Sequence, residues 1–228
     1  MCTVNLDILR QWWRSPALRE LVSDADLVVA DGMPLIWASA VQGQPLPERV
    51  AGSSMTVSLT AAAARAGASV FLLGGNPGAA DGAAQTLRQI SPQLRVAGTL
   101  CPPFGFESDR GAIKWITRRV VDSKPRIVYV GLGFPKQEKL IVALREHLPQ
   151  TWFMPCGISF SFLSGEIRRA SPAVQRLGFE WLHRLVQEPR RLGTRYLLHD
   201  TPFMITLLSQ SCRARGASAR VAATADVS

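Results

Sequence analysis

Short apolar runs alternate with longer segments of helical character along the first 165 residues. The apolar runs predict strands at residues 2–5, 27–30, 69–73, 94–100, 126–130 and 152–154. The segments after them predict helices at residues 6–13, 16–22, 34–41, 55–65, 79–90, 109–121 and 136–147. Strands that alternate with helices in this way indicate βαβ units around a parallel sheet. We therefore expect an α/β fold, a Rossmann-like parallel sheet flanked by helices.

The pattern changes after Gly165, where the predicted strands stop. Residues 172–187 and 190–208 have helical periodicity and are separated by Pro189, while residues 209–228 are rich in Ala, Arg and Ser. A polar C-terminal segment of this kind is expected to be frayed. The sequence thus predicts an α/β core at 1–165, a C-terminal basic helical appendage at 166–208 and a disordered tail at 209–228.

Charge and cysteine content narrow the class of protein. The 228 residues carry a formal net charge of +9, and residues from 166 onward contain ten arginines against five acidic residues. A basic segment of this kind can bind nucleic acid, anionic lipid or a phosphorylated substrate. The four cysteines are scattered without a C-x-x-C pair, which argues against a zinc site and for reduced thiols. No apolar run reaches 18 residues and no signal peptide is visible, so we expect a cytoplasmic location.

Asp31 follows the apolar run at 27–30, whose composition predicts a strand buried on both faces. Gly32 allows a sharp turn, and Pro34 suits the first turn of the next helix. Asp31 would then lie at the carboxyl end of a strand, where open α/β sheets bind ligands. A carboxylate there can act as a general base. The alternative is a turn former or helix cap, which the pair Asp31-Gly32 alone would favour.

Glycine-rich turns follow three predicted strands, at 31–32, 74–78 and 131–133. Backbone N–H groups in such turns can bind phosphate, although each turn alone is equally well explained by tight packing. None has a Walker or complete G-x-G-x-x-G pattern. Three on one sheet edge favour a nucleotide or other phosphate ligand. The predicted ligand-binding glycines are Gly32, Gly74, Gly75, Gly131 and Gly133.

Polar residues at two further places suit a nucleotide or diphosphate. Lys136 and Gln137 begin a predicted helix, where they could contact a phosphate and a base or sugar. The alternative is that both side chains lie on a solvated helix surface, and their spacing alone favours this alternative. Arg184, Arg191 and Arg195 are spaced by seven and four residues, close to one helical face unless Pro189 interrupts it. A guanidinium suits diphosphate, although a solvated basic face is the commoner explanation.

Several short stretches occur in the order found in one enzyme family. They are Thr3-Val4-Asn5, residues 25–32, 45–52, 71–75 and 131–138, Glu180-Trp181-Leu182-His183-Arg184-Leu185, and residues 188–192. Over roughly residues 3–197 the chain resembles the WecG/TagA/CpsF glycosyltransferases, bacterial enzymes of glycosyltransferase family 26. Two departures are visible. The family has some thirty residues ahead of its Thr-x-Asn strand where this chain has two, and its Arg-Ala-Pro sequence is here Arg169-Ala170-Ser171-Pro172.

The resemblance implies an inverting transfer of a sugar from a UDP-sugar to a polyprenyl-diphosphate-linked acceptor, in cell-surface polysaccharide synthesis at the cytoplasmic membrane face. It implies that Asp31 is the catalytic base, with Thr3 and Asn5 beside it. Gln137 falls where the family contacts the nucleotide sugar. Arg184, Arg191 and Arg195 fall in an appendage that closes over the site and meets the acceptor diphosphate. The family lacks a metal-binding Asp-x-Asp, and none follows a strand here, so no metal or cofactor is expected.

One alternative is a nucleotide- or nucleic-acid-binding α/β module without catalysis, suggested by the pI of about 10.2. Aromatic residues on an exposed sheet face would support it, whereas these strands have the composition of buried ones. The expected partners are therefore a UDP-sugar, the lipid-linked acceptor and the cytoplasmic membrane surface, and not nucleic acid. N-acetylmannosamine, its uronic acid and glucose stay open as donor sugars, and so does a homo-oligomer.

Overall fold

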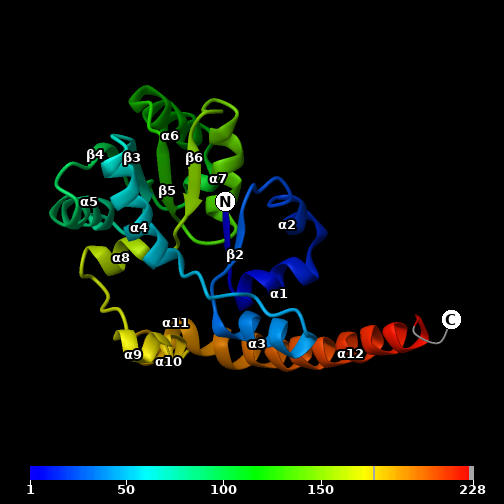
Figure 1. Cartoon of the computed structure of the whole chain (residues 1–228). Coiled ribbons are helices and arrows are strands. Elements are labelled where there is room, and N and C mark those ends of the chain that lie inside the picture. Colours follow the sequence, from blue (N-terminus) through cyan, green and yellow to red (C-terminus); the bar gives the residue numbers. More distant parts are fainter. Residues whose placement is uncertain (177, 226–228) are drawn as a thin grey trace. The chain divides into compact units, whose positions relative to one another are not determined.

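The computed structural model describes residues 1–176 and 178–225, and the chain forms two compact units (Figure 1). The first contains Met1–Thr3, Pro16–Val28 and Ala51–Arg168. The second contains Val4–Ser15, Val29–Val50 and Arg169–Ser228. The C-terminal division lies close to the predicted boundary at 165, but two N-terminal segments that were expected in the core belong to the second unit. Each unit is described by itself.

The first unit is built on a four-stranded parallel sheet of order β4-β3-β5-β6. Its strands are β3 (Ser69–Gly74), β4 (Arg95–Leu100), β5 (Ile127–Gly131) and β6 (Trp152–Pro155). The central pair β3 and β5 is almost wholly buried, as expected for continuous apolar runs in a parallel sheet. The predicted α/β fold with a parallel sheet is confirmed.

Helices cover both faces of this sheet (Figure 1). On one face lie α4 (Gly52–Arg65), α5 (Ala79–Ile90) and α8 (Ser159–Leu163), which pack on Val70, Leu72 and Tyr129. On the other lie α6 (Arg110–Ser123), α7 (Lys136–Arg145) and the 3-10 turn η1 (Phe106–Ser108). Side chains along β3 therefore alternate between two apolar cores. The buried Tyr129 hydroxyl is satisfied by a 2.9 Å hydrogen bond with the Thr60 hydroxyl.

A separate two-stranded sheet is formed by β1 (Cys2–Val4) and β2 (Val28–Ala30). Hydrogen bonds from Cys2 N to Leu27 O and from Asp31 N to Val4 O show that the strands run in parallel. The sequence predicted that residues 27–30 form a strand buried on both faces, and this is wrong. Leu27, just before β2, and Val28, at its start, are 40% and 52% exposed because β2 is not a member of the four-stranded sheet. The short helix α2 (Pro16–Glu20) lies between β1 and β2 in sequence.

The second unit is helical. It contains α1 (Leu6–Arg14), α3 (Met33–Gln42), α9 (Pro172–Arg176), α10 (Glu180–Gln187), α11 (Pro189–Gly193), the π-helix η2 (Thr194–Asp200) and α12 (Thr201–Ala225). The long helix α12 packs against α3, η2 and α1, and its Phe203 ring contacts Trp13 edge-on. These contacts explain why the N-terminal helices belong with the C-terminal segment.

The two helices predicted for residues 172–208 are more finely divided than expected. Gly178 has φ +80°, which ends the first helix early, and Pro189 begins α11 instead of merely interrupting a helix. Residues 209–225 of the predicted disordered tail lie in α12, while residues 226–228 are outside the described part. Among the described residues, no helix combines the length and apolar character needed to cross a bilayer.

Candidate functional site

Asp31 lies where the sequence placed it, directly after a strand and just before a helix. Its backbone N–H donates to Val4 O at 2.6 Å, and Gly32 then turns the chain with φ +149°. Pro34 occupies the first turn of α3, where its missing N–H costs no helical hydrogen bond. Asp31 is half-buried. The structure thus confirms a carboxylate at the carboxyl end of a strand, although that strand belongs to the smaller sheet.

Asn5 lies at the corresponding end of β1, where it begins α1. Its Oδ1 accepts a 3.0 Å hydrogen bond from Ile8 N, and its backbone adopts the extended conformation of a helix N-cap. Because Asp31 N is bonded to Val4 O, Asn5 and Asp31 follow paired ends of neighbouring strands. Both belong to the second unit. Thr3 is buried in β1 at 9% exposure and is assigned to the first unit.

Glycines at the ends of β3 and β5 meet at one edge of the four-stranded sheet. Gly74 and Gly131 are register partners, and Gly75 N donates to Gly131 O at 2.7 Å. A Cβ on Gly74 would lie 2.6 Å from Gly131 O, so close strand packing by itself requires this glycine. The expectation that Asp31-Gly32 shares this edge is wrong, because β2 pairs with β1 in the other sheet.

Gly133 differs from Gly74, Gly75 and Gly131 because a Cβ built on it contacts nothing within 4 Å. It has φ +75° and lies in the turn between β5 and α7. Gln137 holds this turn: its side-chain Oε1 accepts from Gly133 N at 3.2 Å, and its backbone N donates to Gly133 O at 3.0 Å. Gln137 is only 4% exposed, so the alternative of a solvated helix surface does not apply to it.

Glu138 is a buried carboxyl group that sequence reasoning passed over. It accepts a 2.9 Å hydrogen bond from Gln137 Nε2 on Oε1, while Oε2 has no hydrogen-bond partner among the described residues. Burial raises the pKa of Glu138 to about 7, against a smaller lowering effect of the Gln137 hydrogen bond. Burial and the neighbouring Glu138 also raise the pKa of the Cys2 thiol to about 12. Glu138 stands in the motif at 131–138, but only tertiary packing reveals its burial.

Lys136 begins α7 and is exposed. Its ammonium group forms an ion pair with Glu107 and lies 5.7 Å from the centre of the Phe104 ring. The hydrogen bond and charge of Lys136 lower the pKa of Glu107. The loop after β4 is thereby connected to the turn after β5, and a basic group stands at the start of α7.

The three predicted arginines lie in three different helical segments. Arg184 is in α10 and pairs with Glu188 at 3.8 Å, Arg191 is in α11 with its side chain outside the described part, and Arg195 is in η2. The expectation of one helical face assumed a continuous α-helix. The break at Pro189 and the wider turn of a π-helix change the phase between these positions.

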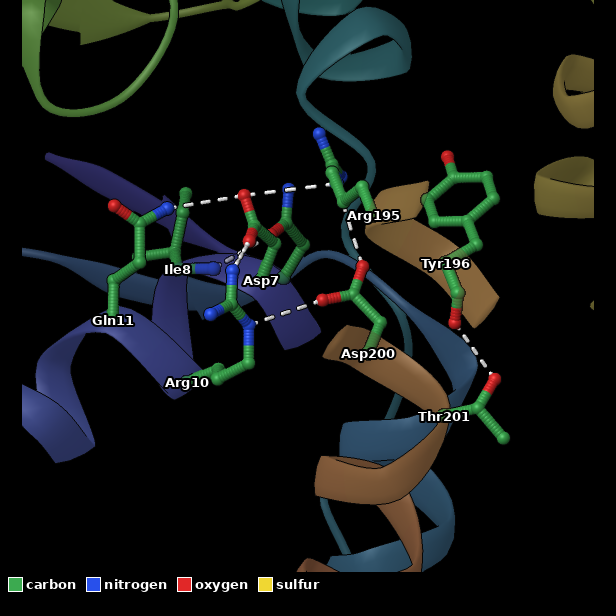
Figure 2. Close-up of polar contacts among 9 residues, drawn as sticks. Asp7, Ile8, Arg10, Gln11, Arg195, Tyr196, Asp200 and Thr201 are labelled. Atoms are coloured by element: carbon green, nitrogen blue, oxygen red, sulfur yellow. Dashed lines mark hydrogen bonds and ion pairs between the residues drawn. The ribbon is translucent and has the colours of Figure 1, made fainter. Parts of the chain in front are cut away.

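Arg195 lies in a cluster of four charged side chains together with Asp7, Arg10 and Asp200 (Figure 2). Burial raises the pKa of Asp200, and nearby Asp7 acts in the same direction, while Arg195 and Arg10 lower it. This cluster belongs to the second unit. In the part of the chain that the structure describes, no group of three or more His, Cys, Asp or Glu side chains is arranged to hold a metal ion.

The predicted site residues thus fall in both units. Asn5, Asp31, Gly32, Arg184, Arg191 and Arg195 belong to the second, and Thr3, Gly74, Gly75, Gly131, Gly133, Lys136 and Gln137 to the first. Their shared feature is position, since most of them stand at a strand end, in the turn that follows it or at the start of the next helix.

Comparison with known proteins assigns the chain to a family. One similar protein is the N-acetylglucosaminyldiphosphoundecaprenol N-acetyl-beta-D-mannosaminyltransferase of Bacillus spizizenii (strain ATCC 23059 / NRRL B-14472 / W23). It is 29% identical over 189 residues, which cover 83% of this chain and 71% of the relative. The model of the glycosyl transferase WecG/TagA/CpsF family matches residues 1–217. The chain, with its Asp-Gly turn after β2 and its glycine turns after β3 and β5, therefore belongs to the WecG/TagA/CpsF family of glycosyl transferases.

Proposed function

We propose that this glycosyltransferase moves a sugar from a UDP-sugar to a sugar on a polyprenyl diphosphate, with inversion at the anomeric carbon. The observation that carries the proposal is the family match over residues 1–217, which includes the strand end that bears Asp31. The name of the Bacillus spizizenii relative supports a polyprenyl-diphosphate-linked acceptor and an N-acetylmannosaminyl donor group.

In the proposed reaction Asp31 is the general base. Its carboxylate accepts the proton of the acceptor hydroxyl while that oxygen attacks C1 of the donor sugar. The bond between C1 and the diphosphate oxygen breaks, and the electron pair leaves with UDP. The half-buried position after β2 supports this role, because a partly desolvated carboxylate at a fixed backbone position is suited to proton transfer.

Negative charge that develops on the leaving diphosphate needs hydrogen-bond donors or cations. We assign this role in the first unit to the turn at Gly133 and to Lys136, with Gln137 holding the turn. The open space at Gly133 and the exposed ammonium group of Lys136 at the start of α7 support the assignment. Gly74, Gly75 and Gly131 then serve close packing at the sheet edge, as the short distances around them indicate.

We further propose that the second unit docks on the cytoplasmic membrane surface, where the acceptor lipid resides. Large apolar side chains are exposed there at Phe179, Trp181, Leu182, Val186, Leu197, Leu198 and Ile205. Val186 and Leu198 are 74% and 67% exposed. Exposed arginines at 190, 213 and 215 lie in the same C-terminal segment. Basic groups attract anionic headgroups, and apolar side chains enter the interface between headgroups and acyl chains.

The test is transfer by an Asp31→Asn variant. A UDP-sugar panel is presented with polyprenyl-diphosphate-linked N-acetylglucosamine in detergent, and the product is measured. Loss of a general base should lower the rate by about 10²–10⁴ while the thermal midpoint stays near that of the wild type. Asp26→Asn, six residues after the end of α2, is the matched control and should retain full turnover. Near-wild-type transfer by a folded Asp31→Asn protein would remove Asp31 from this role, and failure of every donor with the wild type would reject the proposed reaction.

A further inference from the structure

The charged cluster around Arg195 joins α1 to the π-helix η2 within the second unit. Arg195 Nε lies 3.4 Å from Asp200 Oδ2 and 3.7 Å from Asp7 Oδ2. On the other side of the two carboxylates, Arg10 contacts Asp7 Oδ1 at 2.5 Å and Asp200 Oδ1 at 3.4 Å. Gln11 Nε2 donates to Asp7 Oδ2 at 3.1 Å. Two guanidinium groups therefore share two carboxylates, and the formal charge of the cluster is zero.

Burial differs within the cluster. The side chains of Arg10, Asp7 and Asp200 are 12%, 14% and 9% exposed, whereas that of Arg195 is 32% exposed. Arg10 thus balances the negative charge of the two largely buried carboxylates from the buried side of the cluster. Arg195 lies at the outer edge, where its guanidinium carbon is 5.2 Å from the centre of the largely buried Tyr196 ring.

Arg195 contacts the cluster through its inner nitrogen, Nε. Each ion pair that Arg195 makes with Asp7 and Asp200 uses Nε, and the outer end of the guanidinium group points away from Asp200 (Figure 2). Among the described residues, neither terminal Nη group of Arg195 has a hydrogen bond or ion pair of its own. Both Nη groups are therefore available to another anion.

The backbone of η2 sets this orientation. Thr201 donates from both its backbone N–H and its hydroxyl to Tyr196 O, the hydroxyl at 2.8 Å, which closes a turn wider than an α-helical one. The π-helical stretch runs over Thr194–Asp200, so Arg195 and Asp200 are five residues apart at its two ends. That spacing brings their side chains within contact distance on the same side of the helix.

We infer that Asp7 and Asp200 are positioning residues for Arg195, which they hold at Nε so that its two Nη groups face the acceptor diphosphate. This inference rests on the proposed function, in which the acceptor carries a diphosphate, and on the expectation from the sequence that Arg195 contacts that diphosphate. A guanidinium with both terminal nitrogens free can make a bidentate contact to one phosphate group. Arg10 pairs with both carboxylates, so their charge stays compensated while Arg195 contacts its ligand.

The experiment measures acceptor binding and turnover in the full-length protein. Asp7→Asn and Asp200→Asn keep the shape of each side chain and remove its charge, and Arg195→Ala removes the group that they hold. Geranyl diphosphate, titrated by calorimetry, is the probe for diphosphate binding without turnover. Arg195→Ala should weaken binding by about tenfold, as expected for one bidentate charge-assisted contact, and each Asn variant by about threefold.

Kinetics separate positioning from a purely structural role. The Asn variants should raise KM for the lipid-linked acceptor and leave KM for the UDP-sugar unchanged. In the Arg195→Ala background, Asp200→Asn should have no further effect on acceptor KM. Asp122→Asn is the matched control, because Asp122 forms a 3.8 Å pair with exposed Arg118 in α6 and should change neither constant.

Each result decides one point. If Arg195→Ala binds geranyl diphosphate as well as the wild type, the acceptor role of Arg195 fails, and the inference fails with it. If Arg195→Ala weakens binding but both Asn variants bind normally, the role stands and positioning is rejected. Should Asp200→Asn lower the thermal midpoint, the comparison in the Arg195→Ala background gives the answer. An effect of Asp200→Asn on acceptor KM that persists without Arg195 overturns positioning, and its disappearance there supports positioning.

Discussion

The buried carboxyl group of Glu138 should make the first unit less stable as pH rises. Glu138 is 5% exposed, and its Oε2 has no hydrogen-bond donor among the described residues. Its pKa in the folded protein is raised by burial from the ordinary value of 4.5 to about 7. A folded state that binds a proton more tightly than the unfolded state loses stability as that proton is released. The stabilisation of the folded state by proton binding at Glu138 is thus fully present below about pH 4.5 and is lost between pH 4.5 and 7.

Replacing Glu138 by Gln tests this because it keeps the shape and removes the ionisation. The difference between the two pKa values corresponds to about 3 kcal/mol of unfolding free energy. The amide nitrogen of glutamine would take the place of the unsatisfied Oε2, and a buried donor without a partner costs about 1–3 kcal/mol. We therefore expect Glu138→Gln to be up to about 2 kcal/mol more stable than the wild type at pH 8 and less stable than it at pH 5.

The measurement is urea unfolding of wild type and variant at pH 5, 6, 7 and 8, followed by circular dichroism. The difference between the two midpoints should shift in favour of Glu138→Gln as pH rises. Carbon-13 NMR should show one glutamate carboxyl that titrates near pH 7 and disappears in the variant. Glu146→Gln is the matched control, because Glu146 is exposed at the end of the same helix. A midpoint difference that stayed constant from pH 5 to 8 would refute the reasoning.

Three further predictions follow from the same contacts and from the sequence. Asn5→Ala should lower the unfolding free energy by about 1 kcal/mol, because Ile8 N loses the side-chain acceptor that caps the helix. Asn5→Ser should lower it less than Asn5→Ala does, and chemical denaturation measures both differences. Transfer should persist in excess EDTA, because no Asp-x-Asp follows a strand and basic side chains can meet the diphosphate; loss of activity restored by Mg²⁺ would contradict this. Replacing Val186 and Leu198 by Ser should weaken sedimentation with anionic liposomes several-fold while soluble-donor binding is unchanged, and unaltered sedimentation would exclude this surface.

The sequence determined most of the strands and helices before residue 165 and the positions of several candidate site residues along them. Apolar runs bounded by Gly and Pro predicted β3, β5 and β6 to within a residue at either end, because a strand buried on both faces leaves a continuous apolar signature. The same local rules placed Asp31 after β2 and Gly133 in the turn after β5, whereas Asn5, which was expected as the last residue of the first strand, is the N-cap of α1. Each of these depends on residues within one turn or one strand.

Only the tertiary structure decided which elements pack together. The pairing of β2 with β1, the assignment of α1 and α3 to the C-terminal helices, and the joining of Arg195 to Asp7 depend on residues far apart in the chain. Glu138 shows the same limit, since a glutamate in a helix is usually solvated and its raised pKa comes from burial. Periodicity records which face of an element is apolar but not which partner covers it, because apolar burial is non-directional and many pairings satisfy the same pattern.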